Sequence, residues 1–169
     1  GTRLWPNSKN YQPKQFIDFG KWTLFGKTLD RTKASIYDYP IISTNKKYLK
    51  EVKFNLKKNK IKKYKIVLEP SKRNTAPAIL STALIKDIPD NQPLMFFTAD
   101  HLIEKMSIFN KAINKNKSNL TEQNIFIFGI KPKSPSTEFG YFLTKKIKGS
   151  INKVIKFIEK PKENKAKQV

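Results

Sequence analysis

The chain alternates between short apolar runs and longer segments in which apolar positions recur at the spacing of a helix. The short runs predict strands over 41–44, 65–68, 94–98, 125–130, 141–147 and 154–158. The longer segments predict helices over 22–36, 45–56, 77–88 and 103–116. Residues 1–16 contain glycine and two prolines without a clear period, so a loop is predicted there.

Strands that alternate with helices of about a dozen residues are typical of an α/β domain with a mostly parallel sheet. The unbroken apolar run 94–98 (LMFFT) fits a parallel strand that is covered on both faces. Ligands of such sheets bind beyond the carboxyl ends of the strands. Three polar segments are expected there, 69–75, 99–101 and 159–161, and the loop over 1–14 carries groups that would join them.

The composition excludes several classes of protein and of functional site. With 169 residues, 38% of them apolar, the chain is long enough for one domain with a packed core. No apolar run approaches the roughly 20 residues that cross a bilayer. The absence of cysteine excludes disulfides, thiolate zinc sites and a cysteine nucleophile, and a single histidine, His101, excludes a histidine pair.

The formal net charge of +22 has two explanations, and both are compatible with small phosphorylated ligands. A basic chain can bind nucleic acid by neutralising phosphates. Alternatively, abundant lysine, asparagine and isoleucine is the composition that an AT-rich genome produces, and the lysines are spread along the chain like a solvated surface. Only three of the 35 basic residues are arginine, namely Arg3, Arg31 and Arg73, which indicates positions where the planar guanidinium fork is needed.

Asp100 follows the apolar run 94–98 with only Ala99 between them, so its carboxylate would stand at the end of a strand. A carboxylate in that place can bind a hard cation such as Mg²⁺, which keeps waters and phosphate oxygens as its other ligands. It can equally cap the helix that follows. The neighbouring His101 is expected to serve in packing or hydrogen bonding rather than as a ligand or base.

Four other segments carry groups that fit a phosphorylated ligand, although each also has an ordinary structural explanation. Gly1–Arg3 is a glycine-bearing loop whose N–H groups and arginine can hold a phosphate, and Lys14 adds a cation downstream. Arg73–Thr75 opens a helix, where polar ligands are favoured but Asn and Thr also act as caps. Glu159 and Lys160 end the last strand, where they can meet sugar hydroxyls and a phosphate or remain solvated.

Together these segments resemble, in order and spacing, the mannose-1-phosphate guanylyltransferases (GDP-mannose pyrophosphorylases) among the sugar nucleotidyltransferases. The matching segments are 1–6 (GTRLWP), 13–16 (PKQF), 68–70 (LEP), 73–79 (RNTAPAI), 98–101 (TADH), 128–130 (FGI), 139–141 (FGY) and 157–161 (FIEKP). The RNTAPA element separates this group from other sugar nucleotidyltransferases. The departures are Gln12 in place of tyrosine, Thr98 in place of proline, and Phe139 and Phe142 around the glycine; none removes a charged group.

The resemblance implies an α/β, Rossmann-like, mostly parallel sheet flanked by helices, of the nucleotide-diphospho-sugar transferase type. It also implies a reaction of GTP with α-D-mannose 1-phosphate that yields GDP-mannose and pyrophosphate. The sugar phosphate would attack the α-phosphorus in line, with Mg²⁺ as cofactor. Another hexose-1-phosphate nucleotidyltransferase remains the alternative, and a basic nucleic-acid-binding module is the alternative outside the enzymes.

The residue roles that the resemblance implies fall into three groups, with Arg3, Lys14 and Asp100 as candidate catalytic residues. The nucleotide would be bound by Gly1, Thr2, Arg3, Lys14, Arg73, Asn74 and Thr75, the last three on its base side. The sugar phosphate would be bound by Gly140, Glu159 and Lys160. Asp100 would be the ligand of Mg²⁺.

The resemblance begins inside the opening signature of the family and ends at the EKP motif. Residues 1–169 are therefore expected to be a partial nucleotidyltransferase domain, incomplete at its first strand and its C-terminal part. A sheet without its first strand would have an unpaired inner edge, and this chain alone could be poorly stable and inactive. The expected partners are the two substrates, without a membrane or nucleic acid, in the cytoplasm; a homo-oligomer and a fused phosphomannose isomerase module are compatible with the resemblance.

Overall fold

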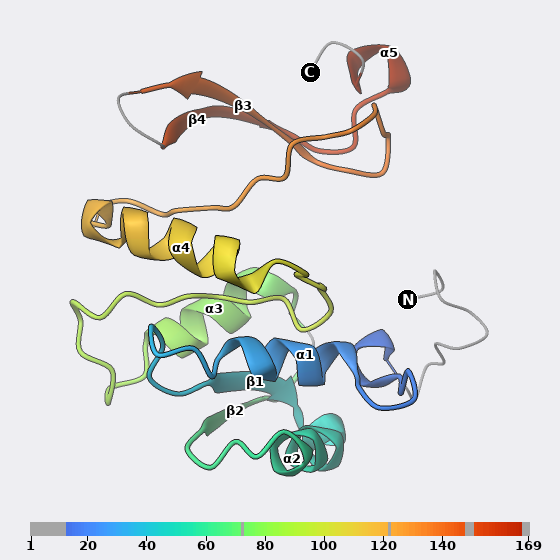
Figure 1. The fold of residues 1–169 in the computed structure, drawn as a ribbon, viewed down its shortest axis with the longest axis vertical. Helices are drawn as coiled ribbons and strands as arrows, with labels where there is room; N and C mark the ends of the chain where they lie inside the picture. The colour runs from blue at the N-terminus through green and yellow to red at the C-terminus, as the bar shows by residue number, and fades with distance from the viewer. Residues whose placement is uncertain (1–12, 72, 122, 148–150, 167–169) are drawn as a thin grey trace. The chain divides into compact units, whose positions relative to one another are not determined.

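The computed structural model describes residues 13–71, 73–121, 123–147 and 151–166 (Figure 1). Gly1, Thr2 and Arg3 therefore lie outside the described residues. The described residues form two compact units, which divide between Lys111 and Ala112. Each unit is described by itself below.

The first unit is built from helices and one pair of strands. Its elements are η2 (Lys14–Phe16), α1 (Leu24–Arg31), β1 (Ile41–Asn45), η3 (Lys46–Tyr48), α2 (Leu49–Lys58), β2 (Lys65–Glu69), α3 (Thr75–Ala83) and most of α4 (Met106–Asn116). Strands β1 and β2 are parallel and pair in register from Ile41 with Lys65 to Asn45 with Glu69. A parallel pair with α2 between its strands in the chain confirms the predicted α/β class.

The core of the first unit lies where η2, α1, β1 and α2 meet. Its buried apolar members are Phe16, Phe25, Leu29, Ile42, Val52 and Leu56. The packing is extended by Thr23, whose Oγ1 accepts from the Gly26 N–H at 2.8 Å as the N-cap of α1 and donates to Asn55 Oδ1 of α2 at 2.7 Å. One buried hydroxyl therefore both starts α1 and fixes it against α2.

Several predicted boundaries differ from the observed ones. Helix α1 ends at Arg31 rather than at residue 36, and the Thr32 hydroxyl donates to the Leu29 carbonyl there, as a local side-chain bond that competes with the helix does. Asn45 caps the next helical segment as predicted, accepting from the Lys47 N–H, but through the short turn η3. The predicted helices over 77–88 and 103–116 are observed as α3 and α4, which have shorter or shifted bounds.

The predicted strands over 94–98 and 125–130 are not formed, although both have the composition of buried strands. A strand exists only where a neighbouring backbone supplies hydrogen-bond partners. Among the described residues, β1 pairs only with β2, and no strand lies against either run. Figure 1 draws the segment before α4 as a plain trace.

The second unit contains an antiparallel strand pair rather than more of the parallel sheet. Its elements are η4 (Lys117–Asn119), β3 (Tyr141–Lys146), β4 (Asn152–Ile158) and α5 (Glu163–Ala166). The pair β3–β4 has a register irregularity between Leu143 and Thr144. Both strands were predicted, but their antiparallel pairing was not.

Large apolar side chains outside the core are often exposed. Leu84 after α3 is 70% exposed and Ile130 is 94% exposed. The described residues therefore do not cover the apolar surface that the sequence carries. None of the helices in the described part of the chain is long and apolar enough to cross a membrane.

Candidate active site

Lys14 and Asp100 come from distant parts of the sequence and form an ion pair in the structure. The Lys14 Nζ lies 2.5 Å from Asp100 Oδ2, and the two side chains are 44% and 24% exposed. This pair brings together two of the three candidate catalytic residues, while the third, Arg3, lies outside the described residues.

Local packing explains why Lys14 is held in this place. The turn η2 is closed by the Phe16 N–H, which donates to the Pro13 carbonyl at 2.9 Å. The Phe16 ring is buried and meets the Phe25 ring edge-on at 5.5 Å between centroids. Phe16, two residues after Lys14, therefore anchors the turn in the core, while the side chain of Lys14 stays accessible.

Asp100 is held by the residues on either side of it. Ala99 packs against the core cluster. The carbonyls of Thr98 and His101 accept hydrogen bonds from Arg31 on α1, at 3.5 Å from Nη2 and 2.9 Å from Nη1 respectively. Arg31 is one of the three arginines of the chain, but no motif of the sequence assigns a role to it.

The packing or hydrogen-bonding role expected of His101 is filled by its backbone carbonyl and not by its imidazole. Its imidazole is 69% exposed, and Nε2 lies 4.0 Å from Asp100 Oδ1. Its hydrogen bonding is made by the main-chain carbonyl instead. The contact at position 101 therefore belongs to the backbone and not to the ring.

Arg73, Asn74 and Thr75 lie at the start of α3, where all three are exposed. Asn74 stands at the N-cap but makes no capping hydrogen bond with its side chain. Its φ of 65° and ψ of −166° fall in a region that is nearly restricted to glycine and costs about 1–3 kcal/mol for other residues. The ordinary explanation of Asn74 as a helix cap is therefore wrong, and its strained backbone requires another reason.

Gly140, Glu159 and Lys160 are neighbours at one end of the β3–β4 pair. The Lys160 N–H donates to the Phe139 carbonyl at 3.1 Å, and Lys160 has a positive φ of 40°. A Cβ added to Gly140 would overlap the ring of Phe157 and lie 3.0 Å from Glu159 Oε2. Any larger residue at position 140 would displace both.

The side chains of Glu159 and Lys160 are directed to solvent rather than into the core. Lys160 Nζ lies 3.6 Å from Glu159 Oε1, with both side chains more than half exposed. Close to this end of the hairpin, the Tyr141 hydroxyl donates to the Ser136 carbonyl at 3.0 Å and accepts from the Ser136 N–H at 2.8 Å. These bonds hold the loop before β3 while leaving the carboxylate and ammonium groups available to a ligand.

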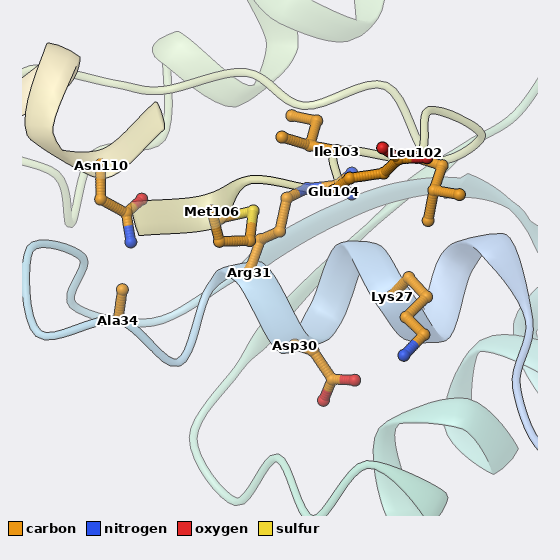
Figure 2. Close-up of a pocket in the computed structure, with 9 residues that line it drawn as sticks. All are labelled: Lys27, Asp30, Arg31, Ala34, Leu102, Ile103, Glu104, Met106 and Asn110. Atoms are coloured by element: carbon orange, nitrogen blue, oxygen red, sulfur yellow. The ribbon is translucent and has the colours of Figure 1, made fainter. Parts of the chain in front are cut away.

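A cavity of about 350 Å³ lies behind the Asp100 segment, between α1 and α4. Figure 2 shows Arg31 reaching from α1 toward Leu102 and Glu104, whereas Asp30 points away from them. Burial lowers the pKa of Arg31, and it raises the pKa of the nearby Tyr37 hydroxyl. The cavity therefore contains a cation that is largely removed from water.

The described residues contain no cluster of three or more side chains of the metal-binding types. Asp100 offers one partly exposed carboxylate at the end of a packed segment. A site of this kind fits Mg²⁺, which takes one or two protein carboxylates and completes its shell with waters and substrate phosphates. It does not fit a cation that needs a cage of protein ligands.

Comparison with known proteins gives consistent matches over the whole chain. A family model described as nucleotidyl transferase matches residues 1–169. The alginate biosynthesis protein AlgA of Pseudomonas fluorescens is 33% identical over 98% of this chain and 35% of its own length. Mannose-1-phosphate guanylyltransferase 2 of Escherichia coli O157:H7 is 38% identical over 95% of this chain and 36% of its own length. The chain thus spans about a third of the length of these curated relatives.

Solved structures match as well. A crystal structure described as mannose-6-phosphate isomerase from Helicobacter pylori has a TM-score of 0.77 and 31% identity, covering 92% of this chain and 59% of that one. A crystal structure described as mannose-1-phosphate geranyltransferase from Thermus thermophilus also has a TM-score of 0.77, at 25% identity, covering 97% of this chain and 48% of that one. Both agree with the α/β class.

Proposed function

This chain belongs to the nucleotidyl transferase family, and from that premise we propose that its full-length protein forms GDP-mannose and pyrophosphate from GTP and α-D-mannose 1-phosphate. The observation that carries the proposal is the 2.5 Å contact between Lys14 and Asp100, which come from two separate motifs. The choice of substrates is supported by relatives that are 33% and 38% identical and are named mannose-1-phosphate guanylyltransferases.

The reaction needs no covalent intermediate with the protein. An oxygen of the sugar phosphate attacks the α-phosphorus of GTP in line, and the bond to the oxygen that bridges the α- and β-phosphorus breaks. That bridging oxygen takes the electron pair and leaves in pyrophosphate. Catalysis is then a matter of positioning and of neutralising charge as it moves to the leaving group.

The described residues have distinct parts in this proposal. Lys14 neutralises charge on the triphosphate, and Asp100 holds Mg²⁺. Mg²⁺ held there would supply positive charge to the phosphates of the nucleotide. The exposed Arg73–Thr75 segment lines the base side of the nucleotide. Arg3, with the backbone of Gly1 and Thr2, holds the β- and γ-phosphates.

The sugar phosphate is assigned to the end of the β3–β4 pair. Lys160 binds its phosphate and Glu159 accepts from sugar hydroxyls, and both side chains are exposed enough to do so. Gly140 allows the close approach of the chain to Glu159 that the structure already has. The reaction implies a cytoplasmic enzyme, because both substrates are made and held there.

The test is pyrophosphate release by the full-length protein with Mg²⁺. GTP, ATP, UTP and dTTP are each supplied with mannose 1-phosphate and with glucose 1-phosphate. We expect turnover with GTP and mannose 1-phosphate. Turnover confined to another pair would retain the mechanism and change the substrates, whereas no turnover by the folded protein would contradict the proposed enzyme.

The matched control is a second carboxylate with the same kind of partner. Asp87 forms an ion pair with Lys65 at 2.5 Å on the surface, as Asp100 does with Lys14. Asp100→Ala is expected to lower the turnover by at least about 100-fold, the scale of losing one electrostatic group at a reacting centre. Asp87→Ala should leave it unchanged, and equal activity of the two variants would remove Asp100 from the mechanism.

A further inference from the structure

Arg31 is a buried cation in a chain that otherwise relies on lysine. Arg31 is only 4% exposed. Among the described residues, no carboxylate lies within ion-pair distance of its guanidinium. Burying a charge costs several kcal/mol unless good hydrogen bonds replace water. The proposed reaction, as assigned above, makes no use of this residue.

The guanidinium of Arg31 donates hydrogen bonds to two backbone carbonyls, one on each side of Asp100. Nη1 donates to the His101 carbonyl at 2.9 Å, and Nη2 lies 3.5 Å from the Thr98 carbonyl. A lysine ammonium is a point charge on a flexible stem and lacks a rigid fork to span two acceptors in this way. The geometry therefore explains why arginine is found here in place of lysine.

Arg31 is itself held rigidly. Nη2 also donates to Thr28 Oγ1 at 2.6 Å, and the guanidinium lies over the Phe97 ring at 5.4 Å from its centroid. Thr28 is buried on α1, which is anchored in the core through Phe25 and Leu29. A chain of contacts thus runs from the core, through the fork, to the residues on both sides of Asp100.

We propose that Arg31 is a positioning residue, which fixes the backbone around Asp100 so that the carboxylate is preorganised for Mg²⁺. This inference rests on the role of Asp100 in the proposed function. Removing a partner that orients a metal ligand typically lowers metal affinity or activity by about 10- to 100-fold. Arg31 acts through Asp100 and touches no substrate.

The first test uses Arg31→Met in the full-length protein, with Val52→Ala as the matched control. Val52 is buried on α2 in the core cluster against which Ala99 also packs, so its truncation loosens that packing but removes none of the hydrogen bonds of Arg31. We expect Arg31→Met to raise the Mg²⁺ concentration that gives half-maximal turnover by about 10-fold or more. The KM for mannose 1-phosphate should stay within about twofold, because that substrate is bound by other residues.

The second readout needs no catalysis. Cleavage of the folded protein by proteinase K within residues 98–102, mapped by mass spectrometry, should be faster in Arg31→Met than in Val52→Ala at equal loss of thermal stability. Equal cleavage and equal Mg²⁺ dependence in the two variants would overturn the proposal. If Arg31→Met is cleaved faster than Val52→Ala but the wild type has no turnover, the proposed function fails and the positioning of the segment by Arg31 stands.

A milder variant covers the case in which Arg31→Met does not fold. Thr28→Val keeps the guanidinium and removes a hydroxyl that accepts from Nη2 and also donates to the Thr98 carbonyl at 3.5 Å. It should shift the cleavage and the Mg²⁺ dependence in the same direction by a smaller factor. A Thr28→Val protein that matches the wild type in both would count against the proposal.

Discussion

Two lysine–aspartate pairs in this chain have the same 2.5 Å separation, yet only one joins candidate site residues. Lys65 and Asp87 meet on the surface, and the hydrogen bond from Lys65 lowers the pKa of Asp87. Lys14 and Asp100 come from segments that the resemblance treats as parts of one site, and the Asp100 carboxylate is much less exposed than that of Asp87. The Lys65–Asp87 pair is therefore the matched comparison for the pair in the proposed site.

Lys14→Met in the full-length protein is expected to lower turnover by about 100-fold or more, because the charge that moves to the leaving group loses its counterion. Lys65→Met should leave turnover within about twofold. Initial rates of pyrophosphate release measure both. A Lys14→Met enzyme with normal rates would show that this ammonium only holds Asp100.

Asn74→Gly tests separately the backbone strain at position 74 and the proposed binding of the nucleotide by the Asn74 side chain. Glycine adopts the φ and ψ of position 74 freely, so the free energy of unfolding is expected to rise by up to about 1 kcal/mol. The KM for GTP should rise at the same time, because the side chain amide is lost. Urea unfolding and kinetics test the two halves independently, and unchanged binding would reduce Asn74 to a structural outlier.

The stability of the protein is expected to depend on pH through the hydroxyl of Tyr37. Burial raises the pKa of its hydroxyl, which has no hydrogen-bond partner among the described residues. As the pH rises through the tyrosine value of about 10, the unfolded chain loses this proton before the folded chain does, so stability falls. Tyr37→Phe should lose less stability between about pH 9 and 11, as measured by thermal unfolding, and an identical loss would contradict the burial of this group.

At the scale of elements, the sequence predicts which segments form helices and strands better than it predicts which strands pair. The runs at 41–45 and 65–69 carry their own signal and become β1 and β2, and Asn45 caps the helical segment after β1. The equally apolar run 94–98 does not become a strand, because strand formation depends on a neighbour that periodicity does not reveal.

The candidate site shows the same division. Asp100 and Lys14 were identified from motifs, and they meet although the strand predicted before Asp100 is not formed, so the expected place of Asp100 at a strand end is not observed. The role of Arg31 was not predictable, because its partners are the backbone carbonyls of residues far along the chain. Every residue has a backbone carbonyl, so the amino-acid sequence does not indicate which carbonyls accept a side-chain hydrogen bond.

Thr23 gives a prediction at the element scale. Its hydroxyl caps α1 and donates to Asn55 on α2, so Thr23→Ala removes both and leaves Asn55 Oδ1 buried. We expect a loss of about 2 kcal/mol in the free energy of unfolding of the full-length protein, from a cap and a buried bond together. Thr75→Ala, at an exposed helix start, is the control and should cost less than half as much.

For the whole molecule, the net charge of +22 predicts weak and non-specific attraction to polyanions. Lysines spread over the chain should bind RNA with an affinity that falls steeply with salt and does not depend on sequence. Filter binding from about 0.05 to 0.2 M salt checks this expectation. Tight binding that persists at the upper end of this range would revive the nucleic-acid alternative.

The contact between Lys14 and Asp100 couples the two ligands of the proposed reaction. In the proposed reaction the ammonium on Oδ2 would reduce the negative charge that Asp100 offers to a divalent cation. A triphosphate that draws Lys14 away would restore that charge, and each ligand would then strengthen the binding of the other by the same factor.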